Sequence, residues 1–94
     1  MRQLLFTSAF KRAFKKLIRR QPNLKASIED RLRFLAIDPF APMLQTHRLK
    51  GKLSGTWACS VEYDCRIIFS FVENEDETED DILLIDIGSH DEVY

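Results

Sequence analysis

The stretch Arg66-Ile67-Ile68-Phe69-Ser70-Phe71-Val72 is almost entirely apolar and rich in β-branched and aromatic residues. A short apolar run of this kind is typical of a central strand that is covered on both faces of its sheet. A second run of the same kind, Ile82-Leu83-Leu84-Ile85-Asp86-Ile87, follows it and ends at Gly88. The sequence therefore predicts two neighbouring strands at the centre of a sheet.

Two further strands are predicted upstream of this pair. Residues 56–63 alternate, with Trp57, Cys59, Val61 and Tyr63 on one face, which is the pattern of a strand in a sheet. The N-terminal residues 3–7 are typical of a short strand. The sheet is therefore expected to have four strands.

Two amphipathic helices are predicted between residues 8 and 38. Thr7 or Ser8 can cap the first helix, Pro22-Asn23 separates it from the second, and Asp38-Pro39 ends the second. Apolar residues at helical spacing form one face of each helix: Phe10, Ala13, Phe14, Leu17 and Ile18 in the first, and Leu24, Ile28, Leu32 and Leu35 in the second. Basic residues fill much of the other face of the first helix: Lys11, Arg12, Lys15, Lys16, Arg19 and Arg20.

The order β-α-α-β-β-β indicates an α+β fold, in which an N-terminal helical hairpin packs on one face of a mostly antiparallel sheet. The other face of the sheet would then be available for function. Residues 40–55 contain Pro42, Gly51 and Gly55 and show no sustained period, so we expect a loop there. A chain of 94 residues has room for one hydrophobic core, and a single domain over residues 1–94 is expected.

The net charge of −1 conceals a strong separation of charge along the chain. Residues 1–52 contain 13 lysines and arginines against 3 acidic residues, a net charge of +10, whereas residues 53–94 contain one arginine against 12 acidic residues, a net charge of −11. The basic half predicts a surface that binds a polyanion. The acidic run over residues 73–81 is expected to be a mobile loop that points away from that surface.

Several classes of protein are disfavoured by the composition. The apolar runs are too short to span a membrane, and the N-terminal apolar stretch is too short for a signal peptide, so we expect a cytoplasmic protein. With a turn near Tyr63-Asp64, Cys59 is expected opposite Ile68 rather than Cys65, which disfavours a disulfide. Two histidines and two cysteines without a pairing pattern predict no metal site, and no cofactor is expected.

The only two histidines lie in distinctive contexts. His47 opens the basic segment His47-Arg48-Leu49-Lys50-Gly51-Lys52, and His90 lies within residues 88–94 at the C-terminus. Imidazole is well suited to proton transfer near neutral pH. If the fold brings the two histidines together, they form a small cationic site with proton donors and an aromatic residue, as metal-free RNA cleavage requires.

Three segments in this order resemble the RelE/ParE superfamily of type II toxins and, within it, the YafQ-like branch. They are His47-Arg48-Leu49-Lys50-Gly51, Tyr63-Asp64-Cys65-Arg66-Ile67-Ile68-Phe69 and Gly88-Ser89-His90-Asp91-Glu92-Val93-Tyr94. The resemblance covers essentially the whole chain and implies a RelE-like fold. It also implies an mRNA interferase that cuts messages in the ribosomal A site, a cognate antitoxin, and contact with operator DNA only through the antitoxin complex.

The resemblance extends to individual residues. His47 matches the loop histidine of YafQ-like toxins, and Asp64 matches the aspartate at the start of their third strand. His90 and Tyr94 match the C-terminal histidine and aromatic residue. Arg66 occupies the position at which many relatives carry an arginine on that strand.

The chain departs from the YafQ-like pattern at two positions. Ser60 stands where these toxins carry another histidine, and Cys65 stands where they carry a tryptophan. These departures put in doubt the number of groups that can transfer protons, although they leave the rest of the site in place.

The chemistry can also be argued from the residues alone. RNA supplies its own nucleophile, the 2′-hydroxyl, so cleavage needs a general base, a general acid and cations for the phosphorane. The expected roles are Asp64 or His47 as base, His90 as acid, Lys50, Lys52 and Arg66 on the phosphate, and Tyr94 stacking on a base or donating a hydrogen bond. The plainer alternatives are a turn residue for Asp64, a structural ion pair for Arg66 and solvated loop charges for the lysines.

Two other functions remain open at this point. One is a ParE-like inhibitor of DNA gyrase, which His90 disfavours because ParE-like proteins generally lack the terminal histidine. The other is a catalytically inactive member that acts only with its antitoxin as a DNA-binding corepressor. Disorder beyond Gly88 would favour this last function.

Overall fold

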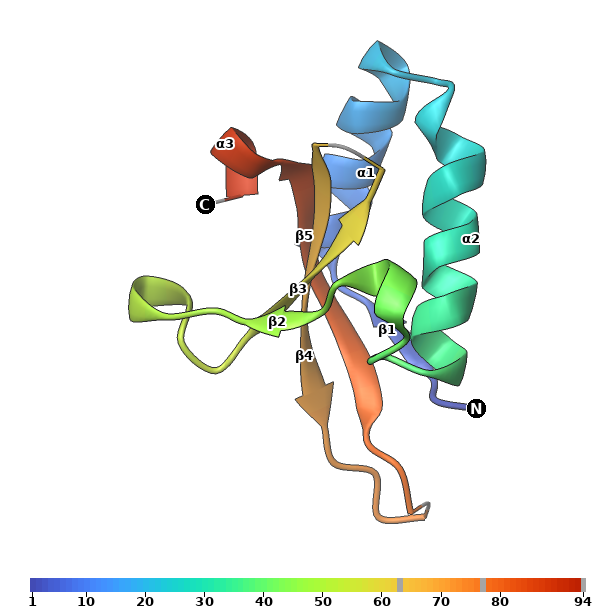
Figure 1. Cartoon of the computed structure of the whole chain (residues 1–94), viewed down its shortest axis with the longest axis vertical. Helices are drawn as coiled ribbons and strands as arrows, with labels where there is room; N and C mark the ends of the chain where they lie inside the picture. The colour runs from blue at the N-terminus through green and yellow to red at the C-terminus, as the bar shows by residue number, and fades with distance from the viewer. Residues whose placement is uncertain (63, 77, 94) are drawn as a thin grey trace.

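The computed structural model describes residues 1–62, 64–76 and 78–93; Tyr63, Glu77 and Tyr94 lie outside the described residues. The elements in chain order are β1 (Leu4–Phe6), α1 (Ser8–Arg20), α2 (Leu24–Ile37), the 3₁₀ turn η1 (Pro42–Leu44), β2 (His47–Arg48), the 3₁₀ turn η2 (Gly51–Leu53), β3 (Trp57–Val61), β4 (Cys65–Val72), β5 (Asp81–Ser89) and α3 (His90–Val93). Figure 1 shows α1 and α2 side by side on one side of the sheet. The predicted α+β class and the helical hairpin are confirmed.

The sheet has five strands in the order β1-β5-β4-β3-β2, so the prediction of four strands is wrong by one. The additional strand is β2, which pairs with β3 through His47 opposite Ala58 and Arg48 opposite Trp57. A strand of two residues is too short to show a period, and it therefore lay within the predicted loop. The sheet is mixed, because β1 is parallel to β5 while the other neighbours are antiparallel.

The helices form where the sequence predicted them. The hydroxyl of Thr7 accepts a hydrogen bond from the Phe10 amide at 3.0 Å and donates one to the Leu84 carbonyl at 2.7 Å, so one residue caps α1 and ties it to β5. The predicted apolar faces of both helices line the core. The buried core residues are Phe10, Leu17, Leu24, Ile28, Leu35, Leu44, Cys59, Val61, Cys65, Ile67, Phe69, Ile82, Leu84 and Ile87.

The other face of the sheet has a second, smaller apolar cluster. Ala58 and Ile68 pack there against Val93 of α3, and Leu49 covers them from the segment that follows β2. Gly88 makes the approach of α3 possible, because a Cβ atom at this position would lie 3.3 Å from Cγ1 of Val93. The C-terminal turn is therefore folded back onto the face opposite the helices.

Cys59 lies opposite Ile67, whereas the sequence predicted Ile68. The register differs by one residue because the turn between the paired residues Val61 and Cys65 has three residues. Both cysteines are free thiols. Burial raises the pKa of Cys59 to about 12 and the pKa of Cys65 to about 11. Both side chains are therefore protonated at neutral pH and are poor nucleophiles.

The acidic run connects β4 to β5 at the end of the sheet opposite to α3, as Figure 1 shows. Arg2 donates a hydrogen bond to the Asp80 carbonyl at 2.7 Å, so the run contacts part of the basic half of the chain. Its expected mobility and its position away from an RNA-binding surface stay predictions. Asp81 is buried at the base of the run and accepts hydrogen bonds from the Gln3 amide and the Asn74 side chain. In the part of the chain that the structure describes, no helix is both long enough and apolar enough to cross a membrane.

Candidate active site

The alternation of β4 places Arg66 on the face of the sheet away from α1 and α2. Its neighbour Ile67 belongs to the core beneath the helices, and side chains alternate between faces along a strand. Arg66 lies between Ser60 of β3 and Gly88 of β5, and its side chain is half-buried. Its Nη1 donates a hydrogen bond to the Cys65 carbonyl at 3.1 Å. A cation is thus held at one end of the open face.

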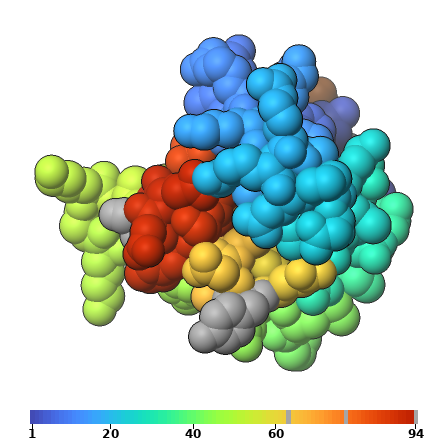
Figure 2. Space-filling model, turned by 90° about the horizontal axis from the view of Figure 1, so that it is seen from above, coloured from blue at the N-terminus to red at the C-terminus, as the bar shows by residue number. Residues whose placement is uncertain are grey.

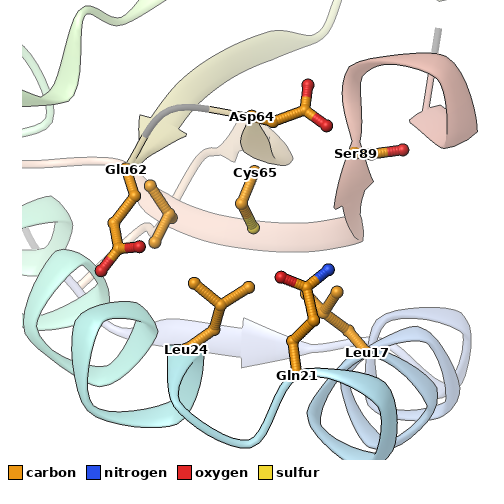
Figure 3. A pocket seen from close by; sticks show the side chains of 8 residues that line it. Leu17, Gln21, Leu24, Glu62, Asp64, Cys65 and Ser89 are labelled. Atoms are coloured by element: carbon orange, nitrogen blue, oxygen red, sulfur yellow. The ribbon is translucent and has the colours of Figure 1, made fainter.

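His90 and Asp64 lie at this same end of the sheet. The antiparallel register of β4 and β5 pairs Cys65 with Ser89, which brings the residues just beyond these strand ends together. The His90 amide donates a hydrogen bond to the Asp64 carbonyl at 3.2 Å. Figure 3 shows the Asp64 carboxylate directed toward the strand end that carries Ser89. The predicted proximity of Asp64 and His90 is confirmed.

The turn that carries His90 is closed by a capping box, a motif that the sequence analysis did not use. The Ser89 amide donates to Oε1 of Glu92 at 3.0 Å, and the Glu92 amide donates to Oγ of Ser89 at 3.3 Å. This reciprocal pair is the Ser-x-x-Glu signature of a helix start, so the sequence held a usable signal. The motif satisfies two amides at the start of α3.

His47 points to the same face as Arg66, because it is paired with Ala58 and directly paired side chains share a face. Its Nδ1 lies 3.1 Å from the carbonyl oxygen of Gln45, which can only accept a hydrogen bond. In the neutral ring Nδ1 therefore carries the proton, and Nε2 carries the lone pair. The strand spacing places the His47 backbone about 12 Å from the Arg66 backbone.

The two lysines of the candidate site lie in the segment between β2 and β3. Lys50 precedes η2 and Lys52 lies within it, and both side chains are exposed. Figure 1 shows this segment projecting from the sheet on the side away from α1 and α2. Leu49 anchors its base on the apolar cluster of the open face. The lysines can therefore meet a ligand that lies across this face, but they are not part of the Asp64–His90 end.

Ser60 of β3 is paired with Arg66 on the open face and is almost fully buried. Its hydroxyl donates a hydrogen bond to the Gln45 side chain at 3.2 Å. Because a serine hydroxyl does not titrate near neutral pH, the position between His47 and Arg66 has no general acid or base. Gln45 contacts both Ser60 and His47, and its backbone is left-handed with φ of 49°. This residue was not identified from the sequence.

A small pocket of about 180 Å³ lies beside Asp64 on the helix side of the sheet. Figure 3 shows the Cys65 sulfur pointing into it, toward Leu24 and Gln21. Apolar side chains form its floor, and Gln21, Glu62, Asp64 and Ser89 also line it. The Cys65 thiol is protonated at neutral pH. His47 and Arg66 lie on the opposite face of the sheet. Among the described residues, no three His, Cys, Asp or Glu side chains are grouped as a metal site would require.

Comparisons with known proteins agree with this architecture. A family model described as "Bacterial toxin of type II toxin-antitoxin system, YafQ" matches residues 2–94. The structure is similar to YafQ from E. coli strain BL21(DE3), with a TM-score of 0.80 and 14% identity over 100% of this chain and 99% of that one. It is similar to the toxin in the E. coli DinJ–YafQ complex, with a TM-score of 0.77 and 14% identity over 99% and 97%.

A third similar structure is a metal-bound toxin from Helicobacter pylori, with a TM-score of 0.77 and 25% identity over 100% of both chains. Comparison with curated proteins gave no match. Two helices on one face of a five-stranded mixed sheet, with charged and imidazole side chains on the other face, define the RelE/ParE-like fold. The chain belongs to the YafQ family of toxins of type II toxin–antitoxin systems. Toxins of this family are generally endoribonucleases.

Proposed function

We propose that this toxin is an endoribonuclease that cleaves mRNA through attack of the 2′-hydroxyl on the adjacent phosphate, without a metal ion. The observation that carries the proposal is the hydrogen bond that holds the His90 turn against Asp64, beside Arg66 on the open face. A proton-transfer group, a carboxylate and a cation thus meet at one strand end. This is the set of groups that the reaction needs.

In the proposed reaction, a base removes the proton of the 2′-hydroxyl, and its oxygen attacks phosphorus. The bond to the 5′-oxygen breaks, and a general acid protonates that oxygen. The base is Asp64 or His47. His90 is the acid, and Arg66 neutralises the phosphorane. The products are a 2′,3′-cyclic phosphate and a 5′-hydroxyl.

The proposed substrate is mRNA in the ribosomal A site. The lysines of the projecting segment, Lys50 and Lys52, bind phosphates of the message, and Tyr94 stacks on a base or donates a hydrogen bond. With Ser60 beside Arg66 in place of a titratable residue, the site has few groups that can transfer protons, and it gains if the ribosome orients the substrate. Fixing the reacting groups in this way can lower a barrier by several kcal/mol.

The proposal predicts discrete cuts in messages on translating ribosomes and slower cleavage of the same RNA alone. The purified toxin should retain this activity in the presence of a chelator that spares ribosomal magnesium, and 5′-end mapping should find hydroxyl groups. A reaction with a ribosome-free transcript in EDTA serves as the metal-free control. Products with 5′-phosphates, or the absence of cuts on ribosomes, would contradict the proposed mechanism.

We further propose that a cognate antitoxin covers the groove between α1, α2 and β1. Phe6, Phe14 and Leu32 line this groove, and Lys11 and Lys15 border it. It continues toward Ile37, which is 60% exposed. An exposed apolar surface with basic borders fits an amphipathic acidic segment that folds on binding. Contact with operator DNA would then occur through the antitoxin.

The groove gives a test of antitoxin binding that is separate from catalysis. Ile37→Asp, which adds a charge to the apolar groove, should weaken the affinity for the antitoxin at least tenfold, a loss of about 1.4 kcal/mol. Calorimetry with the product of the adjacent gene measures the change. Met43→Asp is the matched control, because Met43 is a similarly exposed apolar residue that does not line the groove. Equal affinities of the two variants would place the antitoxin elsewhere.

A further inference from the structure

A pair of charged side chains joins the C-terminal turn to α1 across 72 residues of sequence. Nη2 of Arg20 lies 3.0 Å from both carboxylate oxygens of Glu92. Arg20 is in the last turn of α1, and Figure 2 shows the C-terminal segment, in red, packed directly against α1, in blue. The first helix thus holds the element that carries the candidate general acid.

Glu92 takes part in two interactions at once. Its Oε1 accepts the Ser89 amide of the capping box and also faces Arg20. The hydrogen bond from the Ser89 amide, followed by the interaction with Arg20, holds the pKa of the Glu92 carboxyl below its usual range. The carboxylate is therefore charged at neutral pH, and it connects the helix cap to α1.

The C-terminal turn depends on such contacts for its position. The helix α3 has four residues, and an isolated helix of this length is unstable in water. It is held by the His90 amide on Asp64, by Val93 on Ala58 and Ile68, and by the Arg20–Glu92 pair. The first two contacts lie at the sheet, whereas the ion pair is the contact with α1. Loss of the ion pair would leave the turn attached but able to tilt.

We propose that Arg20 and Glu92 are positioning residues, which fix the imidazole of His90 in the orientation that proton transfer requires. The inference rests on the proposed role of His90 as general acid. A role in global stability does not account for the pair equally well, because the two side chains are 50% and 37% exposed and surface ion pairs contribute little to stability. A displacement of about 1 Å at a catalytic group, in contrast, can reduce the rate up to about 100-fold.

The test compares Arg20→Met with Arg19→Met. Both arginines lie in the last turn of α1, so the control removes the same charge near the helix end without touching Glu92. Arg20→Met should lower kcat about tenfold and leave KM and the melting temperature nearly unchanged, and Arg20→Lys should recover part of the loss. Glu92→Gln, which keeps an acceptor for the Ser89 amide, should behave like Arg20→Met. Arg19→Met should behave like the wild type.

Two-dimensional NMR of the His90 ring gives a measurement that does not depend on RNA cleavage. Arg20→Met should shift and broaden the ring resonances, and Arg19→Met should not. Wild-type ring resonances together with a wild-type kcat in Arg20→Met would overturn the inference. If the ring resonances change but His90→Ala cleaves RNA normally, the proposed function fails while the attachment of the turn stands.

Discussion

Replacing His90 with alanine is expected to lower the rate of mRNA cleavage by at least about 100-fold and to leave the fold intact. The loss follows from removal of the proton that the departing 5′-oxygen receives. The fold should persist because the His90 side chain is 58% exposed and several contacts that hold the turn come from other groups. These are the His90 amide, the capping box of Ser89 and Glu92, and Val93. Alanine retains all of them.

The measurement is the single-turnover rate on programmed ribosomes, with the melting temperature and the affinity for the antitoxin as checks on folding. His90→Gln is the matched variant, since it keeps a polar side chain of similar length but cannot transfer a proton. Both variants should lose activity to the same extent. A rate within about twofold of the wild type in His90→Ala would move the acid role to His47 or to a lysine.

The elements with several turns or several alternations were predictable from the sequence. The inward face of α1 repeats at helical spacing from Phe10 to Leu17, and β4 is an apolar run centred on Phe69, so burial alone determines both elements. The strand β2 was not predictable, because its two residues carry no period and it exists only through pairing with β3. The parallel pairing of β1 with β5 depends in the same way on the arrangement of the whole chain.

The candidate site likewise has features that could be predicted from the sequence and features that could not. The proximity of Asp64 and His90 follows from one assumption, the antiparallel pairing of two consecutive strands, and could be predicted. The tautomer of His47 could not, because it depends on the left-handed backbone at Gln45. The contact of Arg20 with the C-terminal turn likewise results from how α1 crosses β5. The position of Tyr94 lies outside the described residues, and its role stays a prediction.

The helical turn over residues 90–93 also bears on the alternative functions. An inactive member of the family would have no need for a fixed turn beyond Gly88, whereas residues 90–93 form a capped helix that contacts both the sheet and α1. The acidic run lies at the far end of the sheet from this turn. An RNA strand can therefore approach His90 and Arg66 without passing that negative charge, which favours association with a polyanion.

Arg66→Met is expected to lower kcat by about 100- to 1,000-fold, the effect of removing a group that stabilises charge in a transition state. Arg66 suits this role because it is half-buried on the open face, opposite Gly88, which has no side chain. A half-buried cation is screened less by water than an exposed one, so its interaction with a phosphorane is stronger. Methionine keeps much of the apolar stem and removes only the charge and the hydrogen-bond donors.

Two further variants test whether the effect of Arg66→Met comes from the loss of the positive charge or of the planar guanidinium donors, and whether it is specific to this arginine. Arg66→Lys keeps the positive charge but loses the planar pair of donors, so its rate should lie between those of the wild type and Arg66→Met. Arg48→Met is the matched control, because Arg48 stacks on the Trp57 ring at 5.0 Å and points away from the open face. Its removal should leave cleavage unchanged. If Arg66→Met raises KM without lowering kcat, Arg66 binds the phosphate equally in the ground state and the transition state, and another group neutralises the charge of the phosphorane.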